Sequence, residues 1–133
     1  MKDAMIGVAT GCRDGAETGA MTFPEIVATL AGANFEGYAV DFRRARVTYY
    51  ANDGDSVDLA AHRAETPVAA RFDTGAMQAA IREAQSLAPG YAYIGFCEKA
   101  AAAGCAGYVV SLLGRRAVYF GRTAETHIEH FPD

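Results

Sequence analysis

The chain repeats itself at a spacing of 70 residues, and this repeat limits the possible folds more than any other feature. Residues 3–59 align with 73–129 without a gap. The identical pairs are Asp3/Asp73, Ala9/Ala79, Ala31/Ala101, Ala33/Ala103, Gly37/Gly107, Tyr38/Tyr108, Val40/Val110, Arg46/Arg116 and Tyr49/Tyr119. The pattern GYxV followed by RxxY carries most of the similarity. The sequence therefore predicts two copies of one unit in a single domain of residues 1–133, with residues 60–72 as an irregular linker.

Each copy begins with two segments of helical character. In the second copy, apolar residues recur at helical spacing between 77 and 87. In the first copy, Gly7, Gly11 and Gly15 each cost a helix about 1 kcal/mol relative to alanine, so we expect either close packing or incomplete helix there. The next segment starts with Thr22 and Glu25, which have the form of a capping box and predict a helix start.

Each copy continues with strands. Tyr38, Val40 and Phe42 alternate with less apolar residues, which is the period of a strand. We predict two-residue turns at Arg44-Ala45 and Gly114-Arg115, and third strands near 55–59 and 125–129. The order α-α-β-β-β, twice over, predicts an α+β fold in which an antiparallel sheet of about six strands carries its helices on one face.

Composition excludes several classes of protein. The chain has 133 residues, a net charge of −4 and a pI near 5.3, which argues against general nucleic-acid binding. No apolar run approaches the roughly 20 residues that cross a bilayer, and the first residues do not resemble a signal peptide. Three cysteines form no CxxC pair. We expect a cytoplasmic protein with reduced thiols and, because no nucleotide-binding or nucleophile motif is present, no cofactor.

Three stretches of the chain resemble a bacterial family of uncharacterised proteins, sometimes labelled phage-envelope-protein-like. They are FPEIVATLAGANFEGYAVDFRRARVTYY at 23–50, AAIREAQ at 79–85, and GYVVSLLGRRAVYFGRTAETHIEHFP at 107–132. The closing YFGR and HIEHFP strings are the most specific part. The resemblance covers nearly the whole chain and implies a single domain. It implies no activity that could be assigned to particular residues.

Arginines crowd the predicted hairpin ends and are candidate anion ligands. Arg43 and Arg46 belong to the first hairpin, and Arg115 and Arg116 to the second. With the predicted turn, Arg43 faces Arg46 across the strands, where like charges repel. A bound anion would remove that repulsion, whereas acidic neighbours would leave an ordinary solvated turn.

A second candidate site lies near the C-terminus. His127 and Glu129 would share one face of a strand and could bind a metal ion, with a third ligand from His62 or Asp58. The matching residues of the first copy, Val57 and Leu59, are apolar. An exposed edge strand with polar residues is the alternative.

The two hairpins differ on the face that points away from the helices. The second copy places apolar side chains there, and the candidate dimer interface comprises Val109, Leu113, Val118 and Phe120. Soluble monomers seldom expose such a patch, so we expect an identical chain to cover it; a ligand or the linker 60–72 could cover it instead.

The preferred hypothesis is a non-enzymatic, self-associating binding domain that forms a homodimer. The alternative is a small enzyme or ligand-binding protein that acts on an anionic ligand held by the arginines.

Overall fold

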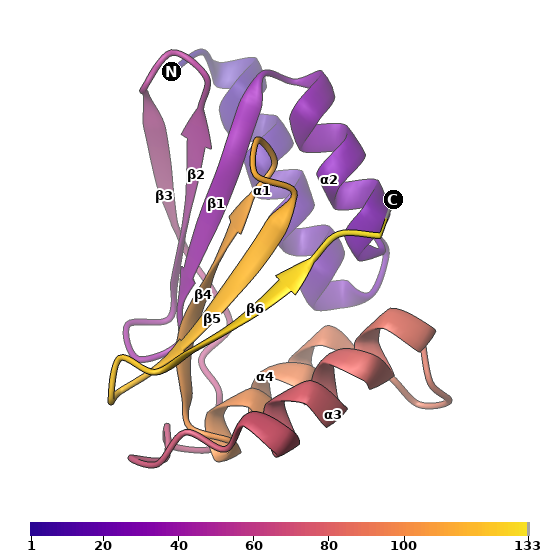
Figure 1. Cartoon of the computed structure of the whole chain (residues 1–133). Coiled ribbons are helices and arrows are strands. Elements are labelled where there is room, and N and C mark those ends of the chain that lie inside the picture. Colours follow the sequence, from indigo (N-terminus) through magenta and orange to yellow (C-terminus); the bar gives the residue numbers. More distant parts are fainter. Residues whose placement is uncertain (133) are drawn as a thin grey trace.

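Four helices and one antiparallel sheet make up the fold, so the predicted α+β class is confirmed (Figure 1). The computed structural model describes residues 1–132. The helices are α1 (Asp3–Thr18), α2 (Phe23–Gly32), α3 (Thr74–Ser86) and α4 (Tyr93–Ala102). The strands are β1 (Phe35–Asp41), β2 (Arg46–Ala51), β3 (Ser56–Ala60), β4 (Cys105–Ser111), β5 (Arg116–Gly121) and β6 (Thr126–His130). The bounds of α4 and of β4 to β6 are those of α2 and of β1 to β3 shifted by 70 residues.

The strand order is β3-β2-β1-β4-β5-β6, so each half of the chain contributes three adjacent strands. β1 and β4 join the halves at the centre, with Tyr38 opposite Val110 and Val40 opposite Tyr108. The order of the second half reverses that of the first about this central pair. The edges of the sheet are therefore β3 and β6, the last strand of each half.

The helices cover one face of the sheet, here called the inner face, in two pairs: α1 with α2 and α3 with α4 (Figure 1). The inner-face side chains of β1 and β2 are buried at Tyr38, Val40, Val47 and Tyr49. Aromatic contacts on this face extend across the centre of the sheet, where the ring centroids of Tyr38 and Tyr108 lie 6.3 Å apart. Burying a large apolar side chain contributes about 1.5–3 kcal/mol, so this face is the main source of stability.

Local signals explain the first two helices. The capping box is present: Thr22 donates its backbone N–H to Glu25 at 3.0 Å, and the Glu25 N–H is donated to the Thr22 hydroxyl at 3.4 Å. α1 is helical throughout despite its glycines. Gly15 is needed for close packing, because a Cβ at this position would lie 2.5 Å from the Met21 Cγ.

The prediction that the hairpin turns contain two residues is wrong. β1 ends at Asp41 and β2 begins at Arg46, and these two residues are paired, so the turn contains four residues. The physical reason is the Asp41 carboxylate, which accepts the backbone N–H groups of Arg43 at 3.0 Å and Arg44 at 3.1 Å. Arg43 therefore lies in the turn and does not face Arg46. The second hairpin is closed in the same way, with Ser111 paired to Arg116.

The linker 60–72 lies against α4. Thr66 donates its hydroxyl to Glu98 at 2.7 Å, and the Ala69 N–H is donated to the Ala101 carbonyl at 3.0 Å. Within residues 1–132, no helix combines the length and the apolar character needed to cross a membrane.

Candidate functional site

The outer face of the sheet, which points away from the helices, changes from polar to apolar across its width. One row of paired residues crosses all of its strands, and the order from β3 to β6 is Asp58, Thr48, Ala39, Val109, Val118 and Ile128. The polar members belong to the first half and the large apolar members to the second. The register thus gathers the apolar side chains of three neighbouring strands.

The apolar patch of the outer face consists of Val109, Val118, Phe120 and Ile128. Val109 is 42% exposed and Ile128 is 45% exposed, whereas Val118 and Phe120 are half-buried. Leu113, the remaining predicted interface residue, lies in the turn after β4 and is 75% exposed. The patch is thus a row of apolar side chains in contact with solvent.

Ile128 was missed by the sequence reasoning, which treated the last strand as polar. Alternation could have found it: His127 and Glu129 share the inner face, so Ile128 must point outward. The linker does not cover the patch: its hydrogen bonds are with α1, α4, the first turn and Arg122 of the β5–β6 turn, which donates to the Val68 carbonyl at 3.2 Å, and none of them involves a patch residue.

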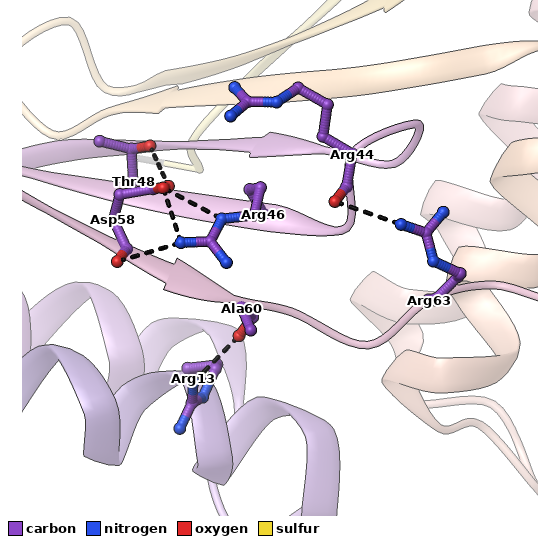
Figure 2. A network of polar contacts seen from close by, with 7 residues as sticks. All are labelled: Arg13, Arg44, Arg46, Thr48, Asp58, Ala60 and Arg63. Carbon is purple, nitrogen blue, oxygen red and sulfur yellow. Dashed lines mark hydrogen bonds and ion pairs between the residues drawn. The ribbon is translucent and has the colours of Figure 1, made fainter.

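Arginines of four segments gather at the end of the first hairpin (Figure 2). Arg46 donates to the Asp58 carboxylate at 3.0 Å through Nε and at 2.8 Å through Nη2. Thr48 donates to the same carboxylate at 3.0 Å. The bonds from Arg46 lower the pKa of Asp58, although desolvation acts the other way. Arg46 is therefore neutralised within the sheet.

Arg13 pairs with Asp14 at 3.0 Å, whereas Arg43, Arg44 and Arg63 form no salt bridge within residues 1–132, although the charge of Arg44 helps to lower the pKa of Asp58. Arg63 donates to the carbonyl oxygens of Arg43 and Arg44, each at 3.4 Å, and these acceptors are neutral. The side chains of Arg43 and Arg44 are exposed and donate to no group in the described part of the chain. Arg63 was not predicted, because its position depends on the docking of the linker.

The predicted arginines of the second hairpin lie at the opposite end of the sheet, because β1 and β4 are antiparallel. Arg115 donates to the Pro132 carbonyl at 3.0 Å, and its guanidinium lies 5.7 Å from the centre of the Phe131 ring. Arg116 donates to the Gly114 carbonyl at 3.2 Å. The structure therefore does not bring the two arginine pairs together.

His127 and Glu129 share a face as expected, and they bind each other. His127 Nε2 lies 2.8 Å from a Glu129 carboxylate oxygen, and Gln85 donates to the other oxygen at 3.4 Å. The expected third ligands, His62 and Asp58, are not close: Asp58 lies on β3, at the opposite edge of the sheet. Residues 1–132 contain no group of three or more potential metal-ligating side chains.

Two hollows open on the helical side of the molecule. One, of about 160 Å³, lies between α3 and α4 and is lined by Tyr91, Phe96 and an ion pair between Lys99 and Glu83. A wider recess of about 490 Å³ adjoins Phe72. None of the predicted site residues lines either hollow.

The thiols do not form a reactive centre. Cys12, Cys97 and Cys105 are buried and free. Burial raises the pKa of Cys97 to about 12 and that of Cys105 to about 11. Because the thiolate is the nucleophile, both groups are inert at neutral pH.

The chain matches a family model described as a protein of unknown function, DUF1398, over residues 15–129. No protein with a curated description matches it. The match spans both halves of the sheet, including the hairpins and the apolar patch, and it carries no named activity. The chain belongs to the DUF1398 family of proteins of unknown function.

Proposed function

We propose that the protein is a non-enzymatic interaction domain that associates with a second copy of itself through the apolar patch. The observation that carries this proposal is the row formed by Val109, Val118 and Ile128, two of which are more than 40% exposed. A contiguous apolar surface of this kind typically marks an interaction site. The reduced, buried thiols suit a cytoplasmic setting, which is part of the proposal.

A second copy is the occupant that the surface favours. The patch lies entirely on one half of the outer face, so a twofold axis through it brings apolar residues against apolar residues. The same arrangement leaves the Arg46–Asp58 pair of the first half outside the contact, where its charges stay hydrated. A contact between the two different halves would instead bury this pair against valine and isoleucine, at a desolvation cost.

The size of the face sets the strength of the association. Strands about 4.8 Å apart and about 3.4 Å per residue give an outer face of roughly 29 by 17 Å. The patch occupies about half of this area, whereas a stable interface buries about 800 Å² on each partner. We therefore expect a weak dimer whose population depends on concentration, with the hairpin residue Leu113 adding area at its border.

The test is the oligomeric state of a double variant, Val109→Glu with Ile128→Glu. Both side chains are exposed, so the variant should fold, and four carboxylates facing one another in the dimer should prevent association. Tyr50→Glu is the matched control, because Tyr50 lies on the outer face of the first half, at the position that corresponds to Phe120, and is 45% exposed. Light scattering and sedimentation over a concentration series measure the result.

The expected outcome is a concentration-dependent dimer for the wild type and for the control, and a folded monomer for the double variant. A wild type that stays monomeric at the highest concentration refutes self-association. A dimer that persists in the double variant shows that the interface lies outside the patch.

A further inference from the structure

Six of the seven tyrosines of the chain gather on the inner face, where the two helix pairs meet. The pairs run in different directions across this face, and their main contact is between α1 and α4 (Figure 1). The six tyrosines belong to four strands and to the segment that leads into α4, and they form the tyrosine cluster: Tyr38, Tyr49, Tyr91, Tyr93, Tyr108 and Tyr119. The seventh, Tyr50, lies on the outer face and is 45% exposed.

Short distances join the members of the cluster. The ring centroids of Tyr38 and Tyr49 lie 5.4 Å apart, and those of Tyr108 and Tyr119 lie 5.2 Å apart. The hydroxyls of Tyr93 and Tyr108 are hydrogen-bonded at 2.6 Å. Tyr38 is the centre of the cluster: burial raises the pKa of its hydroxyl well above the ordinary value, and the nearby hydroxyls of Tyr49 and Tyr119 raise it further.

Three hydroxyls of the cluster have no hydrogen-bond partner. Tyr38 is 6% exposed and Tyr49 is 4% exposed, yet their hydroxyls make no hydrogen bond within residues 1–132, and neither does that of Tyr119. Every side-chain nitrogen or oxygen of the described chain that is sealed from solvent has a partner, so these hydroxyls reach space that solvent can enter. Polar groups this deep in a protein are almost always bonded, so the three hydroxyls are available to a molecule that enters beside them.

A hollow adjoins the cluster. The smaller of the two described above, of about 160 Å³, is lined by Tyr91 and Phe96. The ring of Phe96 lies 6.3 Å from that of Tyr119, and Tyr91 is close enough to Tyr38 and Tyr119 to add to the rise in their pKa that burial causes. Space for the apolar part of a ligand therefore lies next to the free hydroxyls.

The charge at the junction of the helix pairs is negative. Glu17 of α1 adds to the effect of burial in raising the pKa of Tyr49 and that of Cys97 in α4, so its carboxylate lies between the two pairs. It accepts the backbone N–H of His62, a neutral group, and therefore keeps its charge. Arg13, the nearby cation, is paired with Asp14. The junction should therefore repel anions and attract cations.

We propose that the tyrosine cluster binds a small organic cation, an amine with an apolar body, between the two helix pairs. The hydroxyl oxygens of Tyr38, Tyr49 and Tyr119 accept the N–H groups of the ammonium, and the carboxylate of Glu17 supplies the opposite charge. Tyrosine rings bury the apolar body and attract a cation through their faces. The site lies on the inner face and is thus separate from the apolar patch.

Calorimetric titration at neutral pH and constant ionic strength with three probes of similar shape tests the proposal. The probes are phenethylamine, which is cationic, phenethyl alcohol, which is neutral, and phenylacetate, which is anionic. Tyr38→Phe with Tyr49→Phe removes two hydroxyls that bind nothing in the described chain, so this double variant should fold. Tyr50→Phe is the matched control, and Glu17→Gln removes the charge but keeps an acceptor for the His62 N–H.

We expect saturable binding of phenethylamine, with the alcohol about tenfold weaker and phenylacetate weaker still. The tyrosine double variant should bind the amine about tenfold more weakly, whereas Tyr50→Phe should match the wild type. Glu17→Gln should weaken binding of the amine and leave that of the alcohol unchanged. Absence of saturable amine binding, equal binding of amine and alcohol, or unchanged binding in the double variant overturns the proposal.

Discussion

Gly104 packs directly against the backbone of the linker. Gly104, between α4 and β4, has a φ of +87°, and a Cβ there would lie 2.0 Å from the Arg71 carbonyl oxygen. The matching residue of the first half is Asn34, which adopts a φ of 68°. Position 104 thus requires glycine for two reasons: the left-handed backbone and the close approach of the linker.

Substitution of Gly104 should therefore be costly. We expect Gly104→Ala to lower the free energy of unfolding by about 1–3 kcal/mol or more, because strain and a backbone clash add. Gly104→Asn tolerates the backbone angle but keeps the clash, so it should be nearly as destabilising. Gly11→Ala, on the open side of α1, should instead stabilise by about 0.5–1 kcal/mol. Urea unfolding midpoints measure all three, and a neutral Gly104→Asn would show that only the backbone angle matters.

At the scale of elements, the sequence predicts what is encoded locally. The start of α2 follows from Thr22 and Glu25, and the strands follow from alternation. The turn length does not follow, because it depends on which backbone groups the Asp41 side chain accepts. The partner of Arg46 cannot be predicted from the sequence either, because Asp58 lies next to Arg46 only through the pairing of β2 with β3. The sequence therefore identifies the candidate arginines, but it does not show that Asp58 neutralises the charge of Arg46.

The docking of the linker on α4 should depend on pH. Glu98 accepts from the Thr66 hydroxyl and from the backbone N–H groups of Thr66 and Glu65, and these bonds lower its pKa. A carboxyl whose pKa is lowered in the folded state stabilises the docked linker above its ordinary pKa of 4.5, and this contribution disappears as the pH falls through the lowered value.

Amide hydrogen exchange at Thr66 measures this effect. We expect protection at neutral pH that declines under acid conditions, and weaker, pH-independent protection in Glu98→Gln, whose neutral amide makes weaker bonds. Glu65→Gln is the control, because Glu65 contributes only its backbone N–H. Unchanged protection in Glu98→Gln would mean that other contacts hold the linker.

For the whole molecule, the strand order decides what the surface can do. The sequence predicts which side chains share a face of each hairpin, and it identifies Val109, Val118 and Phe120 as outward-facing. It does not predict that β1 pairs with β4, which places the polar and apolar halves side by side on one outer face. That pairing is a contact between distant segments, and no local pattern encodes it.

The same central pairing should make the two halves unfold together. A Cβ on Gly37 would lie 2.4 Å from the Val110 carbonyl, so the ladder between β1 and β4 is closely packed. Leu30 in α2 and Met77 in α3 are each 0% exposed, and truncating either to alanine should cost about 2–5 kcal/mol. If the halves are coupled, each variant lowers the urea midpoint of the entire molecule, and circular dichroism and tyrosine fluorescence give one coincident transition. If Leu30→Ala instead produced an early transition that spared the second half, the halves would be separate folding units, and the single-domain prediction would be wrong.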